Sequence, residues 1–152
     1  MEGGGCSGAL ISNRHVLTAA HCFFEKRHGK ITNRRKGFTG DIGYGSDFKS
    51  ETKSASVSHV EINPTFDNLW LSGSDTAIVT LTKPVTFGNK VGPLCLPANP
   101  SRHYEGYKAF ATGWGRTKWR NGVNKLKEAR VRILFNRKCS RLRRDQNRRF
   151  SK

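Results

Sequence analysis

The chain has 152 residues, with 28 Lys and Arg against 11 Asp and Glu, which gives a formal net charge of +17. Its length suits one compact domain, and a hydrophobic fraction of 35% allows a modest core. No stretch approaches the roughly 20 apolar residues that span a bilayer, and the first residues lack the basic and apolar regions of a secretory signal peptide. We therefore expect neither a membrane span nor a signal peptide in this chain.

The first third of the chain contains signals for short strands. Residues 8–12 and 15–18 are largely apolar and flank Asn13-Arg14, a pattern typical of a tight hairpin. Residues 25–53 are rich in Gly, Lys, Arg and Ser. We interpret most of this stretch as long surface loops around one weak strand, residues 38–44.

Strand patterns continue in the rest of the chain. Residues 56–62 alternate polar and apolar side chains, as expected of a half-buried strand, and residues 76–81 are β-branched and apolar. Two further strands are predicted at residues 107–112 and 126–133. No 3.6-residue amphipathic pattern persists for three turns, so the sequence predicts an all-β barrel or sandwich.

Most of the positive charge lies near the C-terminal end. Residues 116–152 hold 15 basic and 2 acidic side chains, a net of +13, against +4 for residues 1–115. Such a block is typical of a site for nucleic acid, heparin-like polyanions or acidic membrane. We favour the other interpretation, a solvated and partly disordered end, because residues 141–152 contain only Leu142 and Phe150 as large apolar residues.

Four cysteines, at positions 6, 22, 95 and 139, allow three complete pairings, and their spacing alone does not choose among them. No CxxC pair occurs, so we expect no zinc site or other metal centre. Cys6 and Cys22 bracket the predicted hairpin. A disulfide between them would close a loop of about 15 residues and stabilise the fold by about 3 kcal/mol.

The segment Leu17-Thr18-Ala19-Ala20-His21-Cys22 places a histidine after small residues that leave its ring open. By itself such a histidine fits a structural role, and an aspartate such as Asp75, after Gly-Ser, fits a turn. However, residues 6–11 followed by residues 16–22 closely resemble the histidine segment of trypsin-like (chymotrypsin-family) serine proteases. Residues 73–81 resemble the aspartate segment of the same family, an Asp that leads directly into an apolar strand.

The resemblance extends over about residues 6–139, and further segments carry it: Asn63-Pro64-Thr65-Phe66, residues 83–87, 91–97 and 111–117. It implies an antiparallel trypsin-like β-barrel fold. The first barrel would be nearly complete and the second only begun. The domain organisation it implies is residues 1–97 for the first barrel, 98–140 for a linker and the opening strands of the second, and 141–152 for the basic tail.

The resemblance also implies roles for individual residues. His21 would be the general base, and Asp75 the carboxylate that fixes the tautomer of its ring. Cys6 and Cys22 become the expected disulfide, which implies an oxidising, extracellular setting. The implied substrates are proteins or peptides, with no cofactor. We expect His21 and Asp75 at hydrogen-bond distance, and Cys6 within disulfide reach of Cys22.

Part of the family's machinery is absent from this sequence. The nucleophile of the family follows its His and Asp within Gly-Asp-Ser-Gly-Gly, and no such segment occurs here. The serines that follow Asp75 are Ser101, Ser140 and Ser151, and none has a glycine-rich turn for an oxyanion hole. The family's Ile-Val-Gly-Gly start and first strand are also missing. By the resemblance, Cys95 and Cys139 have no partner within the chain.

Two hypotheses about the function follow, one for an enzyme fragment and one for a binding protein. In the first, the chain is a fragment, splice product or incomplete gene model of a trypsin-like serine endopeptidase and is inactive alone. In the second, it is a non-catalytic secreted binding protein on the same half-fold that uses its basic tail to hold heparin-like polyanions or nucleic acid. The first is favoured because motifs are lost at both ends, whereas a selected pseudo-protease would keep its second barrel.

Overall fold

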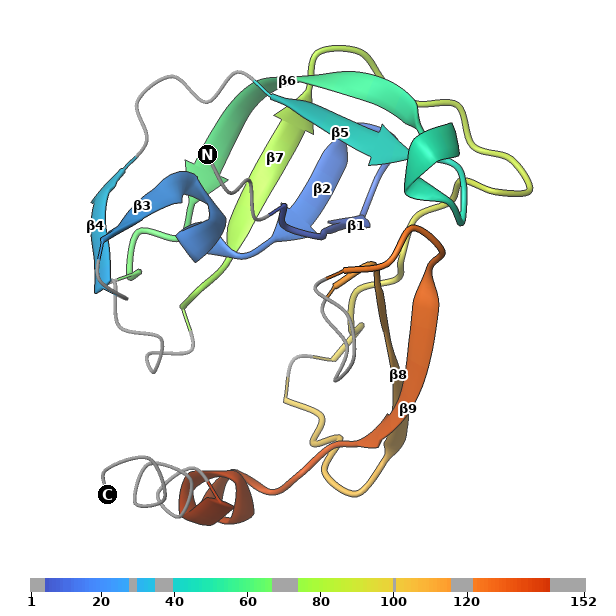
Figure 1. The fold of residues 1–152 in the computed structure, drawn as a ribbon. Coiled ribbons are helices and arrows are strands. Elements are labelled where there is room, and N and C mark those ends of the chain that lie inside the picture. Colours follow the sequence, from blue (N-terminus) through green and yellow to red (C-terminus); the bar gives the residue numbers. More distant parts are fainter. Residues whose placement is uncertain are drawn as a thin grey trace. The chain divides into compact units, whose positions relative to one another are not determined.

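The computed structural model describes residues 5–27, 30–34, 40–66, 74–99, 101–115 and 122–142, with only the backbone for most of residues 25–34. The chain divides into two compact units (Figure 1). The first comprises Met1–Leu96 and Trp114–Lys125, and the second comprises Pro97–Gly113 and Leu126–Lys152.

A curled five-stranded antiparallel sheet forms the first unit. Its strands are β1 (Ala9–Leu10), β2 (His15–Thr18), β5 (Asp41–Tyr44), β6 (Lys53–Ile62) and β7 (Ala77–Leu81). They lie in the order β1-β2-β7-β6-β5, so β7 is central and β1 and β5 are the two edges (Figure 1). The predicted hairpin of β1 and β2 is confirmed, with Ala9 opposite Leu17.

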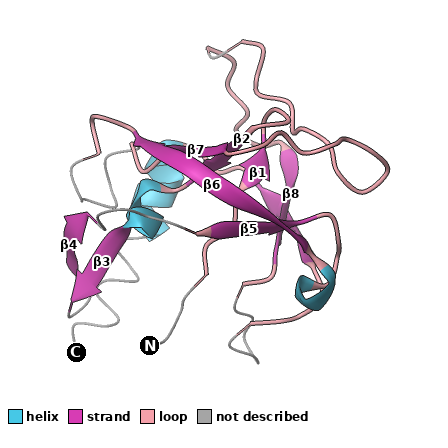
Figure 2. Cartoon of the chain, turned by 90° about the horizontal axis from the view of Figure 1, so that it is seen from above, coloured by secondary structure: helices cyan, strands magenta, loops and turns pink. Residues whose placement is uncertain are grey.

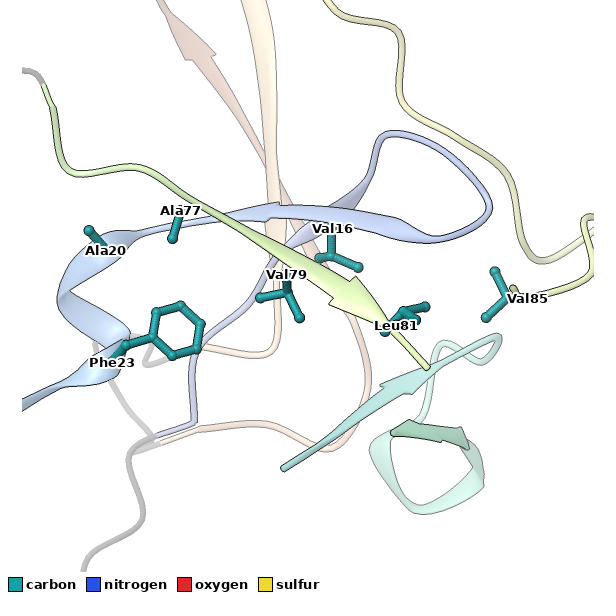
Figure 3. Packing of buried hydrophobic residues seen from close by; sticks show 7 residues of the cluster. All are labelled: Val16, Ala20, Phe23, Ala77, Val79, Leu81 and Val85. Carbon is teal, nitrogen blue, oxygen red and sulfur yellow. The ribbon is translucent and has the colours of Figure 1, made fainter. Parts of the chain in front are cut away.

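The hydrophobic core lies on one side of this sheet. β7 contributes Ala77, Val79 and Leu81, which are 1% to 3% exposed. Val16 from β2 packs into the same cluster, and Figure 3 shows these side chains together with Ala20, Phe23 and Val85. Ala77, Val79 and Leu81 alternate along the central strand, so their side chains share the face that carries the core.

A β-bulge explains the uneven alternation in β6. The half-buried apolar residues are Ala55 and Val57, then Val60 and Ile62. The ladder between β6 and β7 shifts register between Val57 and His59. One extra residue at this point returns the following apolar side chains to the core face, since side chains alternate between the two faces of a strand.

The interpretation of residues 25–53 as mostly loops is wrong. β3 (Phe24–Arg27) and β4 (Lys30–Arg34) form a separate antiparallel hairpin, visible at the left of Figure 2. A short 3-10 helix, η2 (Lys49–Glu51), precedes β6. Backbone pairing between β3 and β4 forms this hairpin, and composition does not reveal such pairing. The weak strand predicted at residues 38–44 is present as β5, and its first two residues lie outside the described part.

The second unit contains a two-stranded ribbon, β8 (Lys108–Gly113) and β9 (Lys127–Arg132), paired antiparallel along its length. Both strands were predicted from the sequence. Residues 136–142 form a short helix that the periodicity analysis did not identify, because two turns are too short for a clear amphipathic pattern. Residues 143–152, most of the basic tail, lie outside the described part. Within the residues described, no helix is long and apolar enough to cross a membrane.

Candidate active site

His21 and Asp75 lie next to the ends of two strands, β2 and β7, that are neighbours in the sheet. β2 ends at Thr18 and leads into the 3-10 helix η1 (Ala20–Phe23), which carries His21, while Asp75 lies just before β7. Thr18 is opposite Ala77 in the antiparallel ladder. The last residue of β2 thus lies beside the first residue of β7. His21 and Asp75, which are 54 positions apart in sequence, meet at this point.

Asp75 holds His21 at two points. Its Oδ1 accepts a hydrogen bond from the backbone N–H of His21 at 2.8 Å, and its Oδ2 accepts one from ring Nδ1 at 2.7 Å. The expected hydrogen-bond distance is thus confirmed. The two side chains are 24% and 25% exposed, so solvent still reaches the pair. With Nδ1 bonded to the carboxylate, the ring is fixed in orientation and the proton of neutral His21 is placed on Nδ1.

The environment of Asp75 favours its charged form. Burial acts to raise the pKa of the carboxyl group, but three effects oppose it: the hydrogen bonds from the ring and backbone of His21, the electrostatic attraction of His21, and the backbone N–H of Ala20. Together they lower the pKa of Asp75 below its ordinary value. The carboxylate is therefore available to stabilise a positive charge on the imidazole.

A disulfide fixes the turn that carries the histidine. Cys6 and Cys22 are bonded, with Cα atoms 6.1 Å apart, and the expected pairing is confirmed. Because Cys22 directly follows His21 within η1, the bond ties this turn to the segment before β1. Cys95 and Cys139 are free and exposed.

A neighbouring loop supports the segment that carries Asp75. Ser74, which is 6% exposed, donates from its hydroxyl to the carbonyl of Thr65 at 2.9 Å. Asn63 donates its backbone N–H to the carbonyl of Thr76 at 3.0 Å. Bonds on both sides of Asp75 thus hold its backbone in place. Sequence patterns do not reveal these positioning roles, since Ser and Asn beside a turn are common in any loop.

Two of the three serines that follow Asp75 belong to the second unit and are described by the structure. Ser140 lies in the short helix of the second unit, where its hydroxyl donates to the carbonyl of Asn136 at 2.9 Å. Ser101 is exposed in a turn of the same unit, and its backbone N–H donates to the Oδ1 of Asn99. Ser151 lies outside the described residues.

One group of potential metal ligands occurs in the described part of the chain. Donor atoms of Cys6, His21 and Cys22 lie within 4.8 Å of one another. The two sulfurs are joined in the disulfide and so are not available as thiolates, which are the form that binds metals. Because its Nδ1 is hydrogen-bonded to Asp75, the ring of His21 is arranged for proton transfer.

Comparisons with known proteins bear on the family of this chain. The family model described as Trypsin matches residues 1–150. Chymotrypsin-C of Rattus norvegicus is 32% identical over 144 residues, which cover 90% of this chain and 49% of that protein. Coagulation factor XI of Bos taurus is 30% identical over 135 residues, covering 88% of this chain and 21% of that protein.

The solved structure of neuropsin, a serine protease expressed in the limbic system of mouse brain, has a similar fold. It superposes with a TM-score of 0.67 at 27% identity, covering 90% of this chain and 57% of its own. The chain thus spans about half or less of the length of the curated relatives named here. The family-model match extends over nearly the whole sequence, and the chain belongs to the trypsin family of serine proteases.

Proposed function

We propose that His21 and Asp75 are the base and the orienting carboxylate of a trypsin-like serine endopeptidase site. The observation that carries this proposal is the two-point attachment of Asp75 to both the backbone and the ring of His21. A carboxylate that served only to close a turn would need the backbone bond alone. The bond to Nδ1 adds control of the ring, which catalysis requires.

In the proposed mechanism His21 takes a proton from a nucleophilic hydroxyl through Nε2, because its Nδ1 is bonded to Asp75. The imidazolium that forms is stabilised by the adjacent carboxylate, whose lowered pKa keeps it charged. His21 would then return the proton to the leaving amine. These roles follow the triad of the family, and this chain supplies two of its three members.

We further propose that this chain alone does not cleave peptides or esters by a serine mechanism. It contains no Gly-Asp-Ser-Gly-Gly segment, and the described serines after Asp75 lie in a turn and a helix of the second unit. Serine proteases that lose a triad residue keep about 10³ to 10⁴-fold acceleration from their oxyanion hole and substrate binding. Without the glycine-rich segment, this residual activity should also be lost.

The test is labelling with a fluorophosphonate probe, together with hydrolysis of Arg, Lys, Phe and Ala esters. We expect neither labelling nor hydrolysis above buffer, with active rat chymotrypsin-C as the positive control. Stoichiometric labelling of any serine, lost in His21→Ala, would contradict the proposed inactivity but support the role of His21. Hydrolysis that His21→Ala and Asp75→Ala leave unchanged would contradict the proposed roles of both residues.

An extracellular location is part of the same proposal. The Cys6–Cys22 disulfide supports it, since such bonds persist in oxidising compartments. The alternative, a secreted protein that binds heparin-like polyanions or nucleic acid, depends on charge alone. This alternative relies on the basic tail, residues 141–152, of which the structure describes only residues 141–142. It therefore stays a prediction.

A further inference from the structure

The two-stranded ribbon of the second unit has two chemically different faces. β8 and β9 pair antiparallel along their whole length (Figure 1), so residues that lie opposite each other share a face, as do residues two apart on one strand. One face is mostly small and apolar and carries Ala109, Ala111, Gly113, Lys127, Ala129 and Val131. The other face, which we call the basic face, carries Lys108, Phe110, Thr112, Glu128, Arg130 and Arg132.

Three cations of the basic face lie close together. Lys108 is directly opposite Arg132, which sets their Cβ atoms about 5 Å apart, and Arg130 lies about 7 Å from Arg132 along β9. All three side chains are exposed, and among the described residues no carboxylate is within ion-pair distance of them. The acidic residue of the face, Glu128, is opposite Thr112, toward the other end of the ribbon.

This arrangement of charges is unfavourable for the fold itself. Like charges directly opposite each other in an antiparallel pair destabilise it, and Lys108 and Arg132 form such a pair. A bound anion attracts both side chains and so offsets their mutual repulsion. The charges of the basic face therefore favour the binding of an anion over a role in stability.

The aromatic ring of the basic face restrains one of the cations. The guanidinium carbon of Arg130 lies 5.8 Å from the centre of the Phe110 ring, within cation–π range, and the two residues are opposite each other in the ladder. The guanidinium carries five N–H donors in a planar fork that suits the oxygens of acidic groups. Because Arg130 is already restrained by the ring, less side-chain entropy is lost when a ligand binds.

The same contact distinguishes between two kinds of polyanion. Proteins that bind single-stranded nucleic acid stack its bases on aromatic side chains. Phe110 is the only aromatic residue in β8 and β9, and its ring is in contact with Arg130. A sulfated polysaccharide needs no such stacking, because it binds through its charged groups. The Cys6–Cys22 disulfide also favours this ligand, since disulfides persist outside the cell, where sulfated polysaccharides occur.

We propose that the basic face of β8 and β9 is a binding site for a linear, heparin-like sulfated polysaccharide. Lys108, Arg130 and Arg132 bind its sulfate groups through charge-assisted hydrogen bonds. The site lies outside the basic tail, residues 141–152, and strand pairing fixes the spacing of its cations. It does not depend on the proposed role of His21.

The test uses the full chain and a fluorescently labelled heparin tetrasaccharide, with binding measured by anisotropy. The ribbon variant combines Lys108→Gln, Arg130→Gln and Arg132→Gln. The matched control removes the same charge from the tail and combines Arg143→Gln, Arg144→Gln and Arg148→Gln. We expect the ribbon variant to bind at least about tenfold more weakly than the original chain, and the tail variant at most about threefold more weakly.

Two further comparisons test the ring and the kind of ligand. Phe110→Leu keeps every charge but removes the ring that restrains Arg130, and it should weaken binding about twofold to fivefold. A single-stranded DNA with the same number of negative charges as the tetrasaccharide should bind the original chain more weakly than the tetrasaccharide does.

Nuclear magnetic resonance of the original chain locates the site without any substitution. The Nε–Hε signals of Arg130 and Arg132 should shift when the tetrasaccharide is added, together with backbone amides of β8 and β9. The proposal therefore stays testable if the ribbon variant does not fold. Equal losses of affinity in the ribbon and tail variants, DNA binding as tight as that of the tetrasaccharide, or signal changes confined to residues 143–152 would each overturn it.

Discussion

Thr18 and Ala77 lie opposite each other at the end of the β2–β7 ladder, and this pairing positions the candidate catalytic pair. The residues that follow Thr18 form η1 with His21, and the residues that precede Ala77 include Asp75. A shift of one residue in this register would turn every side chain of one strand to the other face of the sheet. The site and the core therefore depend on the same alignment.

Substitution of Asp75 should make the stability of the chain less dependent on pH in acid. In the unfolded chain an Asp titrates near pH 3.9, and the folded pKa of Asp75 lies lower than its ordinary value. Its stabilising contribution is thus fully present above the unfolded pKa and is lost as pH falls through the folded pKa. Asp75→Asn should lower the free energy of unfolding by about 1 to 3 kcal/mol near pH 6.5, and by less near pH 3.

Urea denaturation at both pH values measures this difference. Asp47→Asn removes the same charge from an exposed residue of the same unit and serves as the control. A stability gap between the original chain and Asp75→Asn that stays equal at both pH values would show that the charge of Asp75 does not stabilise the fold.

Loss of the disulfide should destabilise the first unit. Replacing both Cys6 and Cys22 with Ser opens a loop whose ends are 16 positions apart, at an expected cost of about 3 kcal/mol. Cys95→Ser is the control, because Cys95 is free and exposed, and it should change stability by less than about 0.5 kcal/mol. Guanidinium denaturation midpoints give both values, and equal stability of the two variants would contradict the expectation.

The core of the first unit should be sensitive to truncation of Leu81. This residue is 1% exposed on the central strand, and Leu81→Ala should cost about 2 to 5 kcal/mol, because the surrounding side chains do not fill the space left behind. Leu94 is 61% exposed, so Leu94→Ala removes the same atoms with an expected effect below about 0.5 kcal/mol. Thermal unfolding monitored by circular dichroism compares the two variants. Similar midpoints would contradict the placement of Leu81 in the core.

Binding to polyanions should depend steeply on salt. Residues 116–152 carry 15 basic side chains, and heparin or DNA should bind at low salt, with log affinity falling by about 0.9 per phosphate neutralised for each tenfold rise in salt. Substituting Gln at Arg143, Arg144, Arg148 and Arg149 should reduce both the affinity and the slope. Titration of labelled DNA measures both the affinity and its dependence on salt. Tight binding at about 0.5 M salt, or preference for one DNA sequence, would instead support a dedicated binding function.

The sequence by itself determined the family and the all-β class. The segments around His21 and Asp75 are recognisable because each is a short, contiguous pattern, and β2, β7, β8 and β9 are visible as local alternation or apolar runs. It also indicated that the glycine-rich segment with the nucleophile does not occur among these residues. Local patterns carry these conclusions, since residues two apart on a strand share a face whatever the rest of the chain does.

Only the tertiary structure decided which distant residues meet. By spacing alone the four cysteines allow three pairings; the family resemblance implied Cys6 with Cys22, and the fold confirms that bond. The two hydrogen bonds between His21 and Asp75 depend on the register of the β2–β7 ladder, and the central place of β7 depends on the order of the whole sheet. Long-range pairing follows from which strands bury their apolar faces together. That choice is made by the complete chain and is not encoded in any one segment.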